Sequence, residues 1–460
     1  MSVIDIIRQR SDRRGRKTGL KKWGLQAFVW VETRFQEGPY HDAAMRDREL
    51  YQQILGISSP WRVADIRLSL ADKQVVVVVA REAVPLSCPK CGRACSGYDH
   101  RTRKWRHLDT CQLQTVIEAE VPRVECPEDG VQQVAVPWAE VGGRFTALFE
   151  AMVIAWLGEA TISAVADLVG LSWEEVDGIQ QRAITRGLAR RQPAMARNIG
   201  IDETSYQDDH EYVTVITDRD RRIVLDVLDD RTKEPVAAWI DRLDEPQKQG
   251  IATVTMDMWE AFITAFRERL PDADRKICFD RFHVARYFGK AVDAVRITEH
   301  NALKADGGKS VLTRTKHQWL KNSERTDNRG RTWFMALTRA SLKTARAWAI
   351  KEQAGKLWSF TSRTWAEKAW RRLLRWMGHC RLDPVKKLAA TIKTHLWGII
   401  NAIVTTSTNA IGESLNARIQ KIKAMACGFR NRQRFRRAIF FHLGGLDLMP
   451  TGVTYPISPT

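Results

Sequence analysis

Three carboxylates stand where they could hold metal ions together. Asp202 follows the apolar start of IGIDETSY, Asp257 ends the apolar run of IATVTMD, and Glu413 lies in NAIGESLNARIQKIK. Bare carboxylates that lie close together repel each other, and divalent cations such as Mg²⁺ or Mn²⁺ remove that conflict. Two such ions can activate a water or a 3′-hydroxyl and stabilise the leaving oxygen of a phosphodiester. A single Asp at a strand end is more often a turn or cap residue, so the prediction rests on the set of three.

The elements that would position these carboxylates alternate between strands and helices. Three strands are predicted in succession, followed by a helix, a strand, a helix and a strand: IGIDETSY, EYVTVITD, RRIVLDVLDD, KEPVAAWIDRL, IATVTMD, WEAFITAFRERL and RKICFD. This order is typical of a ribonuclease H-like fold, an antiparallel meander continued by parallel strands. In such a sheet the strands of Asp202 and Asp257 are adjacent, so both carboxylates can face one site. Glu413 would then complete the site from a later helix.

Clustered cysteines predict a second metal site. Cys88 and Cys91 form the knuckle CPKCG, whose two thiolates can reach one tetrahedral Zn²⁺. Cys126 begins CPEDG, a second knuckle in which Asp129 replaces the other thiolate. Four further side chains are rival ligands: Cys95, His100, His107 and Cys111. We expect a structural zinc, with free buried thiols as the alternative because Cys also behaves as a small hydrophobic residue.

The run TISAVADLVGLSWEEVDGIQQRAI matches a helix-turn-helix. Ala166 is the small residue where two helices touch, Gly170 supplies the positive φ of the turn, and Ser172 caps the second helix. The apolar sites are expected to be buried: Val165, Val169, Leu171, Val176 and Ile179. The exposed side chains of the second helix would face the major groove of DNA: Trp173, Glu174, Asp177, Gln180 and Gln181. An ordinary helical hairpin is the alternative, because acidic residues here disfavour nearby phosphates.

The charge of the chain points to a polyanionic partner. Lys and Arg number 73 and Asp and Glu 54, a net charge of +19. Residues 198–257 hold 15 acidic and 7 basic side chains, whereas residues 286–405 hold 25 basic and 8 acidic ones. Residues 414–437 hold 8 basic side chains and no acidic one. Carboxylates that hold cations, flanked by basic surfaces that neutralise phosphates, indicate a metal-dependent nucleic-acid enzyme. Solvated helix faces are the alternative interpretation of the basic residues.

Length and composition exclude several protein classes. A chain of 460 residues corresponds to about three domains, and a hydrophobic content of 44% with 28% charged residues excludes wholesale disorder. No apolar run reaches the ~18 residues of a membrane helix. The first residues lack the apolar core of a signal peptide. We therefore expect a cytoplasmic, nucleoid-associated protein without a membrane partner.

From Met45 to its end the chain resembles a bacterial insertion-sequence transposase of the ISL-three family. The resemblance is carried by CPKCG, the helix-turn-helix, IGIDETSY, VTMDMWEAF, CFDRFHV and ESLNARIQKIKAMACGFRNRQRF. It implies a multidomain α+β protein in which a ribonuclease H-like α/β catalytic domain is interrupted by a large all-α insertion. It also implies that Asp202, Asp257 and Glu413 are a DDE catalytic triad holding two Mg²⁺ or Mn²⁺ ions. Asp280 and His283 match a D-x-x-H element with an auxiliary role, although His283 alone could equally be a packed core histidine.

The expected domains follow the motifs along the chain. They are a basic N-terminal extension (1–44), a zinc-binding module (45–140), the helix-turn-helix (141–195), the first part of the catalytic domain (196–285), a basic, Trp-rich helical insertion (286–405), the second part with the Glu413 helix (406–445) and a tail (446–460). Related sequences tend to carry His or Cys where this chain has Asp129, and they tend to begin near Met45. The first departure weakens the zinc prediction, and the second suggests that residues 1–44 are an extension.

The implied function is DNA transposition. The zinc module and helix-turn-helix would bind double-stranded terminal inverted repeats, and the catalytic triad would cleave a strand and transfer its 3′-hydroxyl to target DNA. Both ends must be held at once, so we expect a homodimer or higher oligomer. DNA contacts are expected from ten residues: Ser172, Trp173, Gln180, Gln181, Arg182, Arg418, Lys421, Lys423, Arg430 and Arg432. The alternatives are an inactive DNA-binding relic acting as a repressor, and a ribonuclease H-like nuclease or resolvase that cuts without joining.

Overall fold

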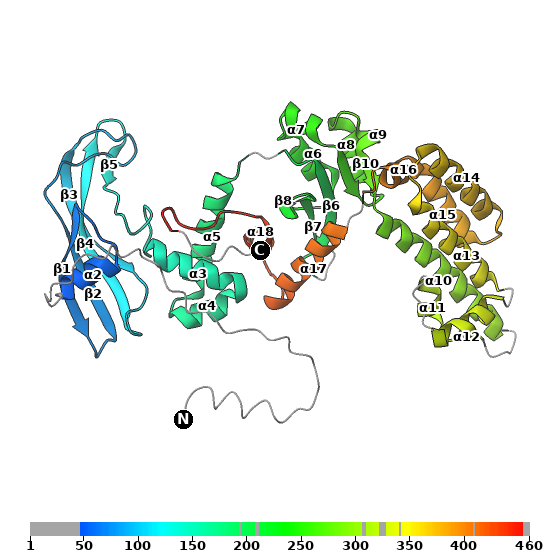
Figure 1. Ribbon diagram of the computed structural model, residues 1–460, viewed down its shortest axis with the longest axis horizontal. Helices are drawn as coiled ribbons and strands as arrows, with labels where there is room; N and C mark the ends of the chain where they lie inside the picture. Colours follow the sequence, from blue (N-terminus) through cyan, green and yellow to red (C-terminus); the bar gives the residue numbers. More distant parts are fainter. Residues whose placement is uncertain are drawn as a thin grey trace, which may run out of the picture.

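The computed structural model arranges the chain as a row of four parts (Figure 1). A first sheet is followed by a group of three helices, a second sheet and a block of helices. The structure describes residues 47–192, 195–207, 211–305, 310–321, 328–339, 342–407 and 410–453. The extension expected at residues 1–44 lies outside the described residues, as does the tail from residue 454.

The first sheet packs around three tryptophans. Its elements are α2 (Asp47–Ile54), β1 (Trp61–Ser69), β2 (Gln74–Arg81), β3 (Ser96–Arg106), β4 (Gln114–Cys126) and β5 (Gly130–Gln133). The strands lie in the order β1-β2-β4-β3, and β5 extends the sheet beside the end of β4. Trp138 meets Trp61 and Trp105 edge to face, with ring centroids 5.1 and 5.5 Å apart. The alternation in β2 turns every second valine into this core, as its period of two requires.

The three-helix group has the local signals that the sequence predicted. Its helices are α3 (Ala147–Glu159), α4 (Ile162–Val169) and α5 (Trp173–Arg190). Gly170 takes a left-handed conformation with φ of 66°, and Ser172 with Glu175 forms a capping box at the start of α5. The expected apolar positions are buried, apart from the partly buried Leu171. The helix-turn-helix geometry is therefore encoded locally.

The second sheet has five strands in the order β10-β9-β6-β7-β8. Its elements are β6 (Asn198–Ser205), β7 (Tyr212–Asp218), β8 (Ile223–Leu228), α6 (Lys233–Asp241), α7 (Glu245–Gly250), β9 (Thr253–Met256), α8 (Glu260–Arg269), α9 (Ala273–Lys276) and β10 (Ile277–Phe279). The first three strands pair antiparallel, and β9 and β10 continue the sheet in parallel with β6. Each predicted strand and helix of this part is present, and the structure adds two short helices that were not predicted, α7 and α9.

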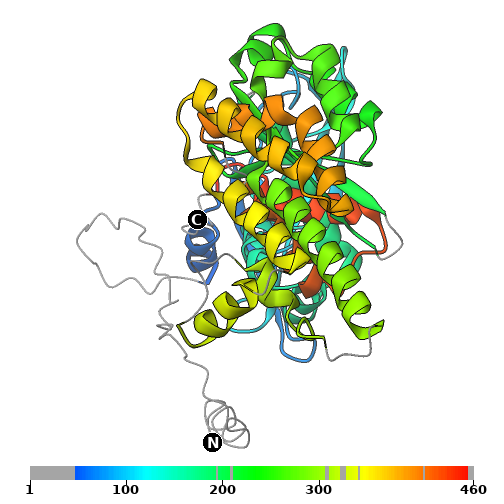
Figure 2. The ribbon, with the colours of Figure 1, turned by 90° about the vertical axis from the view of Figure 1, so that its right-hand side faces the viewer.

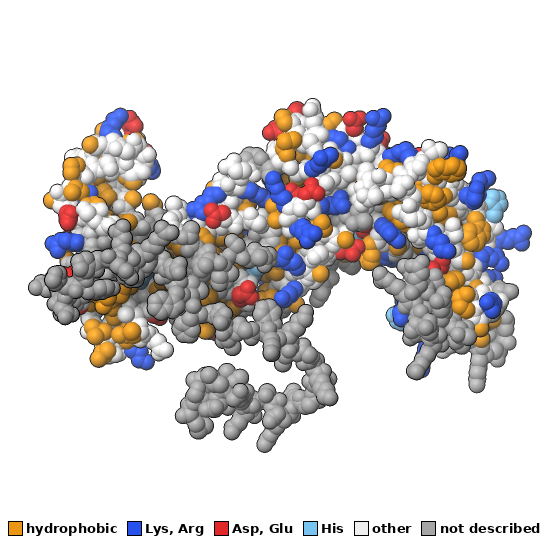
Figure 3. All heavy atoms as spheres, in the orientation of Figure 1, with side chains coloured by type: hydrophobic (Ala, Val, Ile, Leu, Met, Phe, Trp, Pro, Cys, Tyr) orange, Lys and Arg blue, Asp and Glu red, His pale blue; other side chains and the backbone are white. Residues whose placement is uncertain are grey.

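Helices alone form the regular structure of the described residues between β10 and the end of the chain. They are α10 (Arg281–Ala305), α11 (Lys316–Leu320), α12 (Asn328–Arg339), α13 (Lys343–Lys356), the short η2 (Leu357–Ser359), α14 (Arg363–His379), α15 (Asp383–Thr394), α16 (Leu396–Val404), α17 (Ala410–Met425) and α18 (Arg432–Leu443). Figure 2 shows the helical block, α10 to α16, facing the viewer, with its long helices lying across the view. Trp319 and Trp370 are fully buried in it, whereas Trp365 is 62% exposed. Figure 3 shows Lys and Arg side chains over the surface of this block.

The second sheet separates two hydrophobic cores. One core joins β6, α6 and α8 to the helices of the block, and it includes a close contact in which Gly398 of α16 lies against the Phe279 ring. The other core joins β7, β8, α17 and α18 to the three-helix group. The helix-turn-helix thus shares a core with the sheet that carries the carboxylates. No helix among the described residues is long and apolar enough to cross a membrane.

Candidate active site and metal centre

Three aspartates lie side by side where β9 and β10 end: Asp257 and Asp280 directly follow these strands, and Asp202 lies within β6 at the same level. Gly200 of β6 pairs with Thr255 of β9, so Asp202 and Asp257 each follow two residues after that pair. Met256 pairs with Phe279 of β10, which sets Asp280 beside Asp257. The sequence prediction that Asp202 and Asp257 face one site from neighbouring strands therefore agrees with the register of the sheet.

Helix α17 brings Glu413 to this site by lying along β6. Glu413 is in its first turn, and Asn416, one turn later, donates from Nδ2 to Asp202 Oδ2 at 2.6 Å. Gln420 Nε2 donates to Thr204 Oγ1 at 2.8 Å, and Lys423 Nζ donates to the Ser205 carbonyl at 3.2 Å. These side chains lie three or four residues apart and so share one face of the helix. Their contacts fix the register of α17, and with it Glu413, against the strand of Asp202.

His283 joins the two remaining aspartates. It lies in the first turn of α10, where its Nδ1 is 3.1 Å from Asp257 Oδ2 and its Nε2 is 4.0 Å from Asp280 Oδ2. The Asp280 side chain is only 2% exposed, and its backbone N–H donates to the Met256 carbonyl. Both residues of the D-x-x-H element therefore lie next to Asp257 rather than apart from the site.

The acidic groups of the site differ in their tendency to ionise. Burial raises the pKa of Asp202, and the nearby Asp280 and Asp257 raise it further against the opposing charge of His283. Burial, Asp280 and Asp202 likewise raise the pKa of Glu413. Burial also acts on Asp257, but the hydrogen bond and charge of His283 outweigh it and lower its pKa. The pKa of His283 is raised in return, because its carboxylate neighbours outweigh burial. Carboxylates of this kind attract divalent cations, although among the described residues only the cysteine group below has its ligand atoms all within 4.8 Å of one another.

Two neighbours of the site were not predicted from the sequence. Asn416 follows Glu413 by three residues, and this helical spacing is the signal that could have identified it. Glu203 is adjacent to Asp202, and its carboxylate lies 3.8 Å from the Arg231 guanidinium. Burial, and then the charges of Asp202 and Asp257, raise the pKa of Glu203 against the effect of Arg231. The cluster is therefore larger than three carboxylates.

The cysteine knuckles converge as predicted. One ligand atom from each of Cys88, Cys91, Cys126 and Asp129 lies within 4.8 Å of the other three. Asp129 Oδ2 is 3.3 Å from Cys88 Sγ and 3.7 Å from Cys126 Sγ, so the carboxylate occupies the position of a fourth ligand. The backbone N–H groups of Asp129 and Glu128 lower the pKa of the Cys126 thiol against the effect of burial. Three thiols and a carboxylate at these distances fit the tetrahedral preference of Zn²⁺.

The rival zinc ligands lie outside this group. The Cys95 thiol is 3.4 Å from the Arg93 carbonyl, and the buried His107 shares a hydrogen bond of 2.9 Å with the Thr146 hydroxyl. His100 and Cys111 are exposed on β3 and on the connection that follows it.

The second helix of the helix-turn-helix is partly covered, contrary to the sequence analysis. Gln180, expected to be exposed, is buried with 6% of its surface accessible. On α18, Arg437 binds Asp177 at 3.1 Å and Gln181 at 2.9 Å, and the Arg434 guanidinium lies 4.3 Å from the centre of the Trp173 ring. The prediction of a free base-reading face was therefore wrong for Gln180, because α18 packs against this side of α5.

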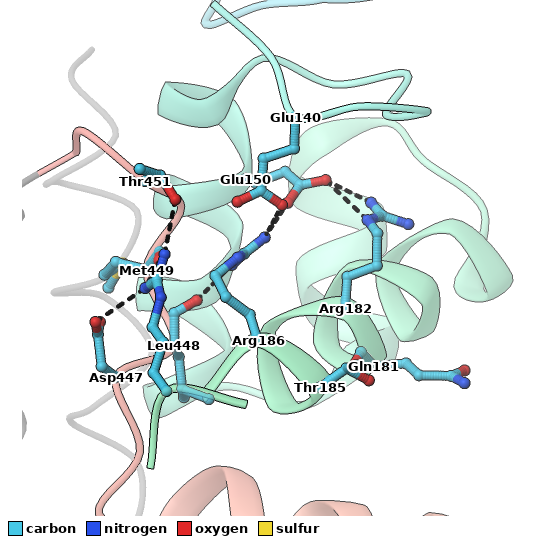
Figure 4. Close-up of polar contacts among 11 residues, drawn as sticks. Glu140, Glu150, Gln181, Arg182, Thr185, Arg186, Asp447, Leu448, Met449 and Thr451 are labelled. Carbon is cyan, nitrogen blue, oxygen red and sulfur yellow. Dashed lines mark hydrogen bonds and ion pairs between the residues drawn. The ribbon is translucent and has the colours of Figure 1, made fainter. Parts of the chain in front are cut away.

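The opposite side of α5 forms ion pairs with α3 and contacts the C-terminal segment 446–453 (Figure 4). Arg182 and Arg186 both bind Glu150 of α3, and Arg186 also donates to the Leu448 carbonyl. Arg190 binds Asp447 and the Met449 carbonyl. Arg182, expected to contact DNA, is thus engaged within the three-helix group.

The remaining predicted DNA contacts lie on α17, on α18 and on the loop between them. Arg418, Lys421 and Arg430 are exposed, and Lys423 is partly buried. Arg432 lies 3.7 Å from Glu211 and stacks over the Tyr206 ring. These basic side chains therefore surround the far end of the helix that carries Glu413.

Comparison with known proteins gives three family matches. A family model described as a transposase matches residues 199–439, which is more than half of the chain. A zinc-finger of the transposases of IS204, IS1001, IS1096 and IS1165 matches residues 85–129. The helix-turn-helix domain of transposase family ISL3 matches residues 134–184.

Curated relatives agree with these matches. The transposases for insertion sequence element IS1557 from two strains of Mycobacterium tuberculosis are 29% identical over 433 residues, which cover 87% of this chain and 96% of theirs. The transposase for insertion sequence element IS1001 from Bordetella parapertussis is 24% identical over 352 residues, which cover 76% of this chain and 86% of its own.

Proposed function

This chain belongs to the ISL3 family of transposases, and from that premise we propose that it cuts and joins DNA at the terminal inverted repeats of an insertion sequence. The observation that carries the proposal is the register of the parallel strands, which sets Asp202 of β6 level with Asp257 after β9, together with a hydrogen bond from the Glu413 helix to Asp202. Family membership makes the chain an enzyme that acts on DNA. The site residues and the reaction steps are our proposal.

The strand order and the helical block suggest the architecture of the catalytic part. An antiparallel meander continued by two parallel strands is the arrangement of a ribonuclease H-like fold, here formed by residues 196–285 and 406–445. The helices between β10 and α17 would be an insertion into it, because α17 returns to lie along β6. We therefore keep the predicted boundaries, with residues 286–405 as the insertion, 45–140 as the zinc-binding module and 141–195 as the helix-turn-helix.

The acidic cluster is suited to two Mg²⁺ or Mn²⁺ ions held by Asp202, Asp257 and Glu413. Bound there, the ions would stabilise charge at the scissile phosphate and favour deprotonation of the attacking water or 3′-hydroxyl. Burial first and then neighbouring carboxylates raise the pKa values of Asp202 and Glu413. Bound cations would offset both effects, which supports this assignment.

The surrounding residues orient the carboxylates. Asn416 holds Asp202 Oδ2, while the Glu203 N–H holds its Oδ1 at 2.8 Å, so the carboxylate cannot rotate freely. His283 fixes Asp257 in the same way through Nδ1, and the Met258 N–H binds the other oxygen of Asp257 at 2.6 Å. Asp280 faces the second nitrogen of His283 and favours its protonated form. Orientation of this kind holds the ligands in place before the substrate arrives.

The N-terminal parts would hold the DNA ends. A structural Zn²⁺ bound by Cys88, Cys91, Cys126 and Asp129 would join the β4–β5 turn to the loop before β3. Exposed basic residues of the helical block and of α17 would bind phosphates on either side of the cut. Two ends must be processed together, so the active assembly would contain at least two copies of the chain.

The test uses the DNA that flanks the gene as a labelled substrate. The wild-type protein should nick it at the tip of the inverted repeat in Mg²⁺ or Mn²⁺ and then form joined products. Asp202→Ala, Asp257→Ala and Glu413→Ala should bind the same DNA without cutting it, because each removes a carboxylate of the cluster. The control is Glu260→Ala, which removes an exposed carboxylate at the start of α8.

Each other outcome has a clear meaning. Cutting by any of the three variants at the wild-type rate would refute the catalytic assignment. Tight binding by the wild-type protein without cutting or joining would instead identify a DNA-binding relic.

A further inference from the structure

A cleft of about 930 Å³ lies between the helix-turn-helix and the hairpin of α17 and α18. Trp173 and Gln180 of α5 form one wall, and Lys423, Arg430 and Arg434 form part of the other. The cleft therefore joins the two parts of the chain that are expected to meet DNA. The proposed chemistry at the carboxylates does not itself require such a cleft.

Positive charge predominates in the lining of the cleft. Among the described residues, Arg430 and Arg434 are exposed and form no ion pair with a carboxylate. Lys423 donates to the Ser205 carbonyl, which leaves two of its three protons for another acceptor. The acidic residue in the wall, Asp177, is already paired with Arg437 at 3.1 Å. Charge complementarity therefore favours an anionic occupant.

The lining also offers flat and apolar surfaces. The Arg434 guanidinium lies 4.3 Å from the centre of the Trp173 ring, and Ile162, Ile422 and Met425 add aliphatic surface. Cations beside aromatic and apolar groups are the combination that binds single-stranded nucleic acid, because phosphates and unpaired bases are recognised together. Paired bases remain stacked inside a duplex and cannot contact such a wall. The volume is that of a pocket for a ligand-sized group and not for a duplex.

Helix α17 connects the cleft to the acidic cluster. Glu413 lies in its first turn and Lys423 ten residues later, a separation of about 15 Å at the rise of an α-helix. At the stacked spacing of about 3.4 Å per nucleotide this distance corresponds to about four nucleotides, and an extended unpaired strand covers it in fewer. The contacts of Gln420 and Lys423 with β6 keep the helix in line with that path.

We propose that this cleft binds an unpaired stretch of the cut DNA strand, within about four nucleotides of the scissile phosphate. Lys423, Arg430 and Arg434 contact its phosphates, and Trp173 with the neighbouring aliphatic side chains receives its bases. The inference rests on the proposed function, because the acidic cluster sets the position of the cut.

The experiment measures binding without cutting, in the Asp257→Ala protein. The probes are duplexes of the gene's own flanking repeat, either fully paired or with an unpaired tail, that carry a fluorescent base analogue at successive positions. The signal from an unstacked analogue should be greatest at a position within about four nucleotides of the cut. The exposed thiol of Cys427, in the wall of the cleft, should be alkylated more slowly when the tailed probe is bound.

Two variants test the residues directly. Trp173→Ala should weaken binding of the tailed probe about tenfold, the effect of one stacked base. Arg430→Ala removes an exposed side chain. For binding of the tailed probe, it should reduce the slope of log affinity against log salt concentration by about 0.7. The matched control is Trp365→Ala, which removes an exposed tryptophan from α14 and should change neither value.

The result that would overturn the inference is equal affinity for the tailed probe of the Asp257→Ala protein with and without each of the two cleft substitutions, with alkylation of Cys427 unchanged. Failure of the proposed function gives a different result, since the wild-type protein would then not cut flanking DNA whatever the cleft binds.

Discussion

Substitution of Glu150 should destabilise the helix-turn-helix more than substitution of any other charged residue in it. Its carboxylate is 4% exposed and accepts hydrogen bonds from Arg182 at 2.5 and 3.1 Å. Its second oxygen lies 3.2 Å from Arg186, whose side chain is 8% exposed (Figure 4). Glu150→Ala would leave the buried guanidinium of Arg186 with Glu140 as its remaining carboxylate partner.

The loss of stability expected for Glu150→Ala follows from the burial of this ion pair. Removing one partner of a buried ion pair costs about 3–5 kcal/mol, because the other charge stays desolvated. Arg186 keeps Glu140 at 2.7 Å and the Leu448 carbonyl at 2.6 Å, so the lower end of the range applies. A decrease of about 3 kcal/mol in the free energy of opening α3 and α5 increases the population in which these helices are unfolded roughly hundredfold.

Hydrogen exchange of the full-length protein measures this population. Peptides from residues 147–190 should exchange faster in Glu150→Ala, while peptides from the first sheet should be unchanged. Glu140→Gln is the control, because the Glu140 side chain is 35% exposed and its loss should cost about 0–1 kcal/mol. Equal exchange in the two variants would refute the argument, since it would show that the charge of Glu150 is not effectively buried.

Three further predictions concern the zinc site, the first sheet and the acidic cluster. The wild-type protein should contain about one Zn²⁺ per chain by elemental analysis, and the Cys88→Ser protein should lose it. The Asp129→Cys protein should release its zinc to a chelator more slowly than the wild type. Equal zinc content in all three proteins would contradict the site. Burial, with a smaller effect of Arg106, lowers the pKa of His107 to about 4. As the pH falls below about 6.5, His107 is therefore protonated in the unfolded chain but stays neutral in the folded chain. Stability should therefore fall by about 3 kcal/mol between pH 6.5 and 4, and denaturation of His107→Gln should show a smaller fall. Asn416→Ala should slow single-turnover cutting in Mg²⁺ at least about tenfold, the effect of a lost charge-assisted hydrogen bond to Asp202. Gln420→Ala should slow it less, because Gln420 bonds the Thr204 hydroxyl and not a carboxylate; equal rates in the two variants would exclude a positioning role for Asn416.

Local patterns explain why much of the fold could be predicted. The helix-turn-helix follows from apolar spacing, the capping residue Ser172 and the positive φ of Gly170, all interactions within a few residues. The alternation of strands and helices around Asp202 and Asp257 is likewise a local signal, and the register of the sheet then places both residues at the same edge. The knuckles of Cys88 and Cys126 are short turns that are visible as motifs, and β4 and β5 bring them together.

Other features depend on contacts between distant parts of the chain. Asn416 meets Asp202 across 214 residues, and Arg437 meets Asp177 across 260. No periodicity in the sequence reports such pairs, because they depend on how finished helices and strands pack against one another. The sequence thus determined the elements, the zinc knuckles and the acidic residues at strand ends. Only tertiary packing decided that α18 covers part of α5 and that a cleft remains beside it, since both result from burying two helix faces in a shared core.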